Sequence, residues 1–148
     1  MRNLIGLVVV LLVAASCGGP AEESVVGNVK PEINVPDGDP PSTLQSEDLI
    51  EGDGATVREG ATVTIHYVGV SWSTGEEFDS SWEGGEPATF PLGQLIPGWQ
   101  EGIPGMKAGG RRQLTIPPEL AYDDAPPPGS GIEPGETLIF VIDLVEAG

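Results

Sequence analysis

The sequence is poor in several residue types on which whole classes of function depend. Its 148 residues include one cysteine, one histidine and six lysines or arginines, against 23 aspartates and glutamates. A single cysteine excludes an intramolecular disulfide. The formal net charge of −17 opposes binding to nucleic acid, because phosphate repulsion would act over most of the surface. Nucleic acid is therefore not an expected partner.

The scarcity of histidine and cysteine also bears on catalysis and metal binding. His66 falls on the polar face of a predicted strand without a second histidine or a thiolate, so we expect it to be solvated rather than a metal ligand. No Ser/His/Asp or Cys/His set can be assembled around it. The acidic pairs at 123–124 and 37–39 lack the spacing of a calcium loop. We therefore expect no metal, no cofactor and no covalent catalysis.

The first 16 residues are predicted to be a signal peptide. A short, positively charged start precedes an apolar run over residues 4–15, which is too short to span a bilayer. Small residues follow, directly before Cys17. This pattern resembles a bacterial lipoprotein signal, although Ala14 stands where leucine is usual. The resemblance implies export and a lipid anchor on Cys17 in a cell-envelope membrane. The alternative is an ordinary cleaved signal and a secreted protein.

Two further segments follow the signal. Residues 17–45 are rich in proline, glycine and acidic residues and lack an apolar period, which predicts an extended tether with a reach of about 30 Å. Residues 46–148 are predicted to form the globular domain. Its only basic cluster, Lys107, Arg111 and Arg112, is expected to be a solvated strand edge. Nothing in the sequence requires more than a monomer.

Alternating apolar residues predict an α+β domain, with an antiparallel sheet of about five strands around one short helix. Val63, Ile65 and Tyr67 share one face of a strand over residues 62–70. The other strands are predicted at 77–79, 87–92, 111–116 and 137–145. The helix is predicted from Ile96 to about residue 101, with Pro97 suited to its first turn.

Aromatic residues make up only 5% of the sequence, and most fall between Tyr67 and Phe140. Trp99 lies in the densest part of this pattern, between prolines and glycines. The other rings come from separate predicted strands and loops. This arrangement predicts a shaped apolar pocket. Each ring could instead be ordinary core, and Asp79, followed by two serines, could instead cap a turn.

Five motifs occur in order along the domain: HYVG (66–69), FDSS (78–81), LGQLIPGWQEGIPGM (92–106), LTIPPELAY (114–122) and LIFVIDL (138–144). Together they resemble the FKBP-type peptidyl-prolyl cis-trans isomerases from about Gly52 to Val145, nearly all of the globular part. The resemblance implies the FKBP fold and an isomerase that rotates X–Pro bonds in exported polypeptides. It also implies proline-containing substrates, and macrolides as possible inhibitors.

The family's site positions carry over one residue at a time. Trp99 would be the floor under the substrate proline, with Tyr67, Phe78 and Phe140 as walls and Leu95 as a further apolar contact. Ile96 N–H and the Tyr122 hydroxyl would donate to substrate carbonyls, and Asp79 would be the polar group at the rim. The resemblance thus implies catalytic roles for Asp79, Tyr67, Trp99, Tyr122 and Phe140, and substrate contacts from Phe78, Phe90, Leu95, Ile96 and Ile132.

Two places depart from the family pattern. Ala88 stands where the family often has an aromatic residue, so one pocket wall could be missing and macrolide binding weaker. The loop after Tyr122 reads DDAPPPGSGIEPG, where many members have glycine directly after the tyrosine. These departures keep a second function open, namely a proline-peptide binding module or envelope chaperone with little turnover.

Overall fold

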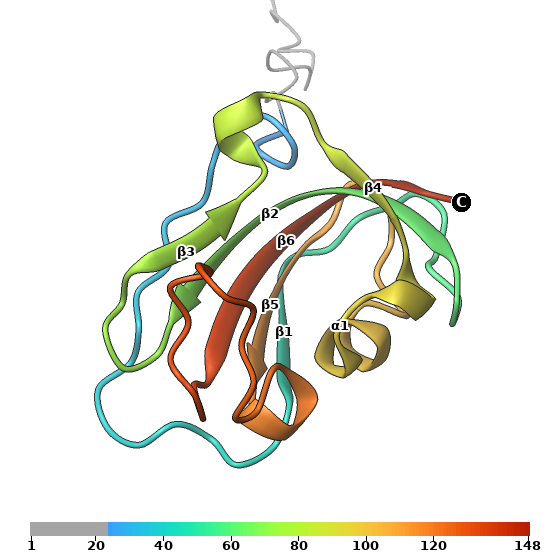
Figure 1. The fold of residues 1–148 in the computed structure, drawn as a ribbon. Coiled ribbons are helices and arrows are strands. Elements are labelled where there is room, and N and C mark those ends of the chain that lie inside the picture. Colours follow the sequence, from blue (N-terminus) through green and yellow to red (C-terminus); the bar gives the residue numbers. More distant parts are fainter. Residues whose placement is uncertain (1–23) are drawn as a thin grey trace, which may run out of the picture.

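The computed structural model describes residues 24–148 and shows an antiparallel sheet with one short helix against it (Figure 1). The predicted signal peptide, Cys17 and the first part of the predicted tether lie outside the described residues. The strands are β1 (Gln45–Ile50), β2 (Thr62–Ser71), β3 (Glu77–Ser80), β4 (Ala88–Pro91), β5 (Arg111–Ile116) and β6 (Leu138–Ala147). The helix is α1 (Pro97–Gly102), and single 3₁₀ turns are η1 (Trp82–Gly84), η2 (Leu92–Gln94) and η3 (Pro118–Leu120).

The strands are ordered β1-β5-β6-β2-β3, and β4 pairs with β2 beyond the end of β3. On β6, Leu138, Phe140, Ile142 and Leu144 belong to the same buried cluster as Val63 of β2. This two-residue period places one face of the sheet over the helix, as the sequence predicted. The predicted fold class is confirmed, with one strand more than expected.

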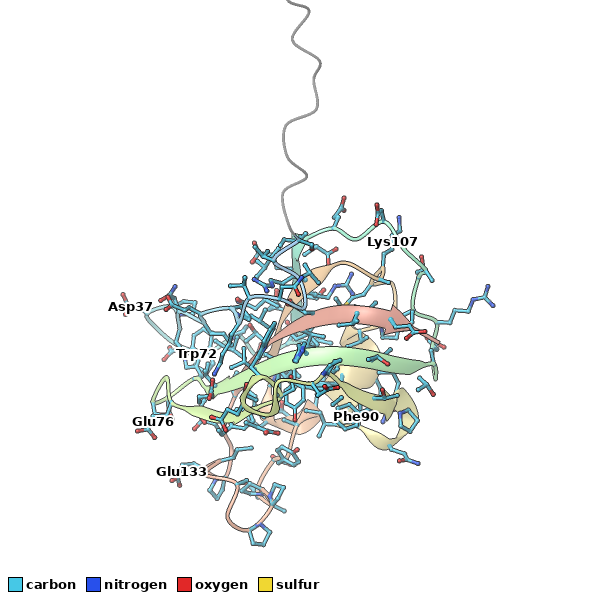
Figure 2. All side chains as sticks on the ribbon, turned by 90° about the horizontal axis from the view of Figure 1, so that it is seen from above. Asp37, Trp72, Glu76, Phe90, Lys107 and Glu133 are labelled. Carbon is cyan, nitrogen blue, oxygen red and sulfur yellow. The ribbon has the colours of Figure 1, made fainter. Side chains whose placement is uncertain are left out.

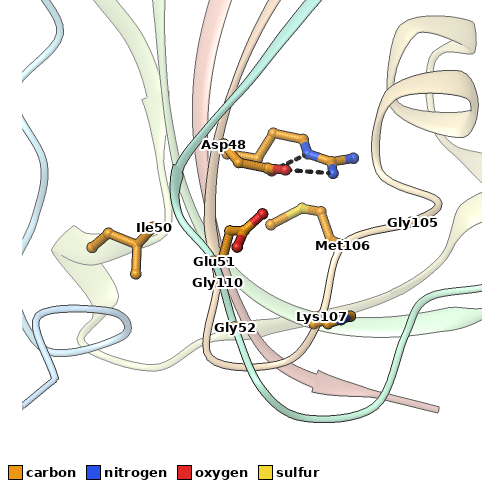
Figure 3. Close-up of a pocket in the computed structure, with 9 residues that line it drawn as sticks. Asp48, Ile50, Glu51, Gly52, Gly105, Met106, Lys107 and Gly110 are labelled. Atoms are coloured by element: carbon orange, nitrogen blue, oxygen red, sulfur yellow. Dashed lines mark hydrogen bonds and ion pairs between the residues drawn. The ribbon is translucent and has the colours of Figure 1, made fainter.

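The additional strand is β1, which the apolar pattern could not reveal. It is an edge strand whose residues are exposed except for partly buried Ile50, so it has no alternating burial. It is held to β5 by backbone pairing and by Arg112, whose Nε lies 2.7 Å from Asp48 Oδ1 (Figure 3). The Arg112 side chain also donates to the carbonyl of Gly102 at 2.8 Å. The hydrogen bond from Arg112 lowers the pKa of the Asp48 carboxyl.

Helix α1 lies on the inner face of the sheet, where it needs a close approach to β5. Pro97 occupies its first turn, where a missing N–H costs nothing. A Cβ atom on Gly98 would collide with the side chain of Ile116, and one on Gly102 would come within 2.7 Å of Leu114 Cδ2. Glycine at these positions therefore lets the helix backbone rest directly on the strand and fixes the height of Trp99 above the sheet.

The opposite, outer face of the sheet is covered by residues 24–38, called here the outer segment. It appears in blue in Figure 1, and Val26 within it is buried. Its residues 30–34 run past Val68 and Val70 and enclose a groove of about 530 Å³ with them. Its far end meets Trp72, whose Nε1–H donates to the carbonyl of Gly38 at 3.2 Å, near Asp37 in Figure 2. This part of the predicted tether is therefore docked along the sheet.

The outer segment is fastened by a buried ion pair that the sequence analysis did not anticipate. Arg111 Nε and Nη2 lie 2.6 and 2.8 Å from the two carboxylate oxygens of Asp143, which is 1% exposed. Arg111 also donates to the carbonyl of Val29 at 2.7 Å, and Gly27 N–H donates to Asp143 at 2.7 Å. The expectation that Arg111 and Arg112 form a solvated strand edge is wrong for both residues, because each guanidinium binds a carboxylate and donates hydrogen bonds to backbone carbonyls.

The expectation of a solvated His66 is also wrong. The side chain does lie on the outer face, but it is only 4% exposed. Its ring stacks on Trp82 at a centroid distance of 4.1 Å and an interplanar angle of 14°. The alternating pattern placed the residue on the correct face, but it could not show that Trp82 from η1 folds over that face.

Within residues 24–148, no helix has the length and apolar character needed to cross a membrane.

The Arg111–Asp143 pair should dominate the stability of the outer face. Asp143→Ala would leave a buried guanidinium without its counter-charge, and we expect it to lower the free energy of unfolding by about 3 kcal/mol. The matched control is Asp48→Ala, which removes the carboxylate that binds Arg112. The Asp48 side chain is 40% exposed, so its loss should cost about 1 kcal/mol or less of unfolding free energy. Urea unfolding of both variants measures the difference. Equal losses would show that the outer face is not fastened by this pair.

Candidate functional site

An apolar cavity of about 320 Å³ opens on the inner face of the sheet. Strand β2 contributes Tyr67, β3 contributes Phe78 and Asp79, β4 contributes Phe90 and β6 contributes Phe140. The remaining lining residues come from the η2–α1 segment and from the turn after η3: Gln94, Leu95, Ile96, Trp99 and Tyr122. Six segments between residues 67 and 140 therefore converge on one pocket, as the scattered rings predicted.

Trp99 lies at the centre of the aromatic contacts. Its ring meets Phe140 at 5.0 Å and Tyr67 at 5.3 Å, with interplanar angles of 89° and 75°. Phe78 meets Phe140 at 5.4 Å and 90°, and Phe90 meets Trp99 at 6.4 Å and 75°. Edge-to-face contacts of this kind are favourable for aromatic rings and hold each ring at a fixed angle. Trp99 itself is 5% exposed, so it is both pocket floor and core.

Space for two of the walls depends on Gly69. A Cβ atom at this position would lie 2.6 Å from the rings of both Phe140 and Phe78. Any side chain there would displace one of the two rings. Gly69 is therefore the residue of HYVG that lets the aromatic walls stand against β2.

The polar groups of the pocket are few, and two of them bind each other. The Tyr67 hydroxyl donates to Asp79 Oδ2 at 2.9 Å, and the backbone N–H of Ser80 donates to Asp79 Oδ1 at 2.9 Å. Asp79 thus makes both the pocket contact and the local turn contact that the sequence allowed. Burial, the hydrogen bond to Asp79 and the charge of Asp79 all raise the pKa of Tyr67. Burial and Asp79 also raise the pKa of Tyr122.

The start of α1 offers a free donor at the edge of the cavity. Ile96 is the N-cap residue, and its carbonyl accepts from Trp99 N–H at 3.0 Å. Among the hydrogen bonds of residues 24–148, none uses the Ile96 N–H. The side chain of Gln100 donates to the carbonyl of Leu95 at 2.7 Å and steadies the turn into the helix. The Ile96 N–H is therefore available to an acceptor at this edge of the cavity.

The structure brings together every predicted pocket residue except one. Ile132 is packed against the hydrophobic core but does not line the cavity. Conversely, Gln94 lines the cavity and was not among the predicted residues, because a polar residue beside Leu95 carries no aromatic or charge signal. Cys17, the predicted lipidation site, lies outside the described residues.

The lining of this pocket is mostly aromatic and aliphatic. The cavity is lined by six aromatic rings, two aliphatic side chains, one amide and one carboxylate, and its lining includes no serine, cysteine, histidine or lysine. Among residues 24–148, no group of three or more histidine, cysteine or acidic side chains could hold a metal ion. A small apolar ring bearing two carbonyl groups nearby would match the cavity and its donors.

Comparison with known proteins now decides the family. Residues 54–145 match the family of FKBP-type peptidyl-prolyl cis-trans isomerases. The chain belongs to this family. It is 59% identical over 119 residues to a probable FK506-binding protein of Corynebacterium glutamicum, covering 80% of this chain and 98% of that protein. It is 57% identical over 118 residues to an FK506-binding protein of Streptomyces anulatus, covering 78% of this chain and 95% of that protein.

Solved structures of FKBP proteins share the fold. The crystal structure of FkpA from Escherichia coli has a TM-score of 0.64 at 40% identity, covering 70% of this chain and 47% of that one. The crystal structure of AtFKBP13 also has a TM-score of 0.64, at 38% identity, covering 74% of this chain and 96% of that one. The chain is thus an isomerase of the FKBP type, and the sequence-based identification of the family is confirmed.

The two departures from the FKBP pattern lie at or beyond the margin of the pocket. Ala88 pairs with Ile65 between β4 and β2 and does not line the cavity. Asp123 stands directly after Tyr122 with φ of 48°, in the left-handed region that favours glycine. Its carbonyl accepts from Gly135 N–H at 2.7 Å, which closes the loop on itself. The loop therefore keeps the left-handed turn without the glycine.

Both tyrosines of the chain should remain protonated at pH values where free tyrosine ionises. Burial and Asp79 disfavour the phenolate at Tyr67 and Tyr122, so we expect absorbance at 295 nm to show no step near pH 10 in the folded protein. The unfolded protein in urea should titrate near pH 10. Since the folded pKa values are raised, the associated stability is complete below about pH 10 and is lost as pH rises further. A folded-state step near pH 10 would contradict a closed pocket.

Proposed function

We propose that the protein catalyses rotation about X–Pro bonds in exported polypeptides, with the proline ring seated on Trp99. The observation that carries the proposal is the apolar cavity, walled by rings at fixed angles, with a single carboxylate and an uncommitted backbone donor at its edge. Uncatalysed isomerisation takes tens to hundreds of seconds, slow enough to limit folding. An exported chain would therefore benefit from such a catalyst.

The apolar pocket suits this reaction because no bond is made or broken. Resonance between the amide nitrogen and the carbonyl opposes rotation by about 18–20 kcal/mol. The twisted transition state loses this resonance and its carbonyl carries less charge separation, so a water-poor site favours it over the planar ground state. Lowering the barrier by about 4 kcal/mol would accelerate rotation about a thousandfold.

The side chains divide this work by position. Tyr67, Phe78, Phe90 and Phe140 exclude water and clamp the proline against Trp99. Ile96 N–H holds a substrate carbonyl on one side, and the Tyr122 hydroxyl, which stays protonated because its pKa is raised, holds another. Asp79 fixes the Tyr67 hydroxyl and sets the potential at the rim.

Substitutions at the floor and at the rim test this assignment. In a protease-coupled assay with Leu-Pro and Phe-Pro peptides, Asp79→Ala should lower kcat/KM about tenfold, because the exposed carboxylate is lost without a change in the core. Trp99→Leu keeps apolar volume but removes the flat floor, and it should cause a larger loss.

The control for both variants is Glu76→Ala, an exposed residue on the turn between β2 and β3. It should retain the wild-type rate. Trp99→Leu should lower the unfolding midpoint because Trp99 is also core, so a midpoint well above the assay temperature separates loss of catalysis from loss of fold. A folded wild-type domain that binds proline peptides without accelerating isomerisation would instead identify a binding module.

A macrolide such as FK506 should occupy the same cavity. Relatives at 57–59% identity are named for binding FK506. Ala88 does not line the cavity, so the wall that an aromatic residue at this position would supply is absent, and macrolide binding should be weaker for that reason. Because Trp99 forms the floor, occupancy should change the tryptophan fluorescence of the protein, to which Trp72 and Trp82 also contribute. Macrolide and proline peptide should compete.

We further propose that the protein is anchored to a cell-envelope membrane by a lipid on Cys17 and acts as a monomer. The support is the apolar run over residues 4–15 and the small residues before Cys17. Because the chain is already docked at Gly27, residues 18–23 alone separate Cys17 from Ser24, a span of at most about 25 Å. The domain would therefore lie close to the membrane.

Replacement of the cysteine tests the anchor. Cys17→Ala should move the protein from the membrane fraction to the soluble fraction of the source cell and abolish labelling by a palmitate analogue, since no thiol remains to carry the lipid. The isomerase rate of the released protein should equal that of the wild type. If the variant stays with the membrane, the lipoprotein interpretation is wrong.

A further inference from the structure

Strand β2 has a gap in its backbone pairing beside the pocket. On one side β2 pairs with β6 along nearly its whole length, with one bulge between Thr64 and Ile65, but on the other it is shared by two short strands. β3 pairs with Val68–Val70, and β4 pairs with Thr62–Ile65. His66 and Tyr67 lie between these stretches and have no strand partner on that side. A backbone N–H at such a place needs another acceptor.

Ser81 fills this gap. The Tyr67 N–H donates to Ser81 Oγ at 2.8 Å, and the Ser81 N–H donates to the Tyr67 carbonyl at 3.0 Å. The serine hydroxyl therefore takes the place of a strand carbonyl as the chain leaves β3 for η1. Ser81 follows Asp79 by two residues, so these contacts tie the backbone of Tyr67 to the segment that carries Asp79. The same two residues meet on the pocket side through the hydroxyl–carboxylate bond of 2.9 Å.

The hydroxyl of Ser81 is held from the outer face by His66. His66 Nδ1 lies 2.9 Å from Ser81 Oγ, and the imidazole is clamped flat against Trp82. The charged groups across the strand do not compete for Ser81, because Asp143 of β6 is bound by Arg111 of β5 and by Gly27 N–H. The imidazole tautomer decides whether Nδ1 accepts from the Ser81 hydroxyl or donates to it, and in the second case the hydroxyl donates to the Tyr67 carbonyl at 3.3 Å. With either tautomer, Ser81 Oγ accepts from the Tyr67 N–H.

We propose that Ser81, oriented by His66, is a positioning residue for the isomerase site. Ser81 does not line the cavity. Its hydrogen bonds set the distance between β2 and the β3–η1 corner, and that distance sets the geometry of the hydrogen bond between Tyr67 and Asp79. This inference rests on the proposed catalytic role of that pair. The neighbouring serine serves a different purpose, since Ser80 Oγ accepts from Trp82 N–H at 3.1 Å, and Ser80 pairs with Val68 of β2 as an ordinary strand residue.

The adjacent serines provide a matched pair of variants for the test. Ser81→Ala should lower kcat/KM for proline peptides about tenfold by loosening the Tyr67–Asp79 bond, whereas Ser80→Ala should stay within about twofold of the wild type. Ser81→Thr retains the hydroxyl and should recover most of the rate. If Ser81→Ala does not fold, His66→Phe keeps the stack on Trp82, removes the hydrogen bond, and should lower kcat/KM about threefold.

A double-mutant cycle separates positioning from general destabilisation. In a Tyr67→Phe background the pocket bond is already gone, so Ser81→Ala should cause less than about a twofold further loss. The same factor of loss in both backgrounds would show a merely structural role and overturn the inference. Full activity of Ser81→Ala beside an impaired Asp79→Ala would also overturn the inference. If Ser81→Ala does not fold, full activity of His66→Phe beside an impaired Asp79→Ala would overturn it in the same way. A wild-type protein without catalysis would instead overturn the proposed function.

Discussion

The antiparallel pairing of β2 with β6 is the constraint on which the rest of the structure depends. It runs from Val63 to Ser71 on β2 and places Tyr67 opposite Ile142 and Gly69 opposite Phe140. Side chains alternate along both strands, so one register determines what both faces carry. On the inner face it assembles the pocket, and on the outer face it brings Asp143 to the ion pair that fastens residues 24–38. A slip of one residue would destroy both at once.

The pocket uses core packing to obtain a defined shape. Trp99 is nearly buried and still forms the floor, because the glycines of the six-residue helix α1 bring it down onto β5. The rings around it meet edge to face, so each aromatic side chain of the pocket packs against another aromatic ring rather than against a flexible side chain. Ligand contact and fold stability therefore come from the same atoms. This explains why composition alone could not separate pocket from core at these residues.

The sequence predicted the elements that bury an alternating face, and it did not predict those held by polar contacts. β2, β5 and β6 were found because their apolar residues repeat every second position. β1 and the docking of residues 24–38 were not found, since they depend on Arg112 with Asp48 and Arg111 with Asp143, partners that lie 64 and 32 residues apart. No local pattern records such a distance. The prediction of a solvated His66 was wrong for the same reason, because the residue that covers it, Trp82, comes from η1.

The charged side chains stabilise the fold and mostly lie outside the pocket. The basic side chains at Lys30, Arg111 and Arg112 each bind a carboxylate on the sheet, so they act as fasteners in a chain whose acidic residues are mostly exposed. Only one carboxylate lines the pocket, and the Tyr67 hydroxyl and Ser80 N–H already hold its two oxygens. The strong negative charge of the protein is thus kept outside the site. A pocket that works by withholding water from an amide requires that separation, because an uncommitted charge at its centre would bring water in with it.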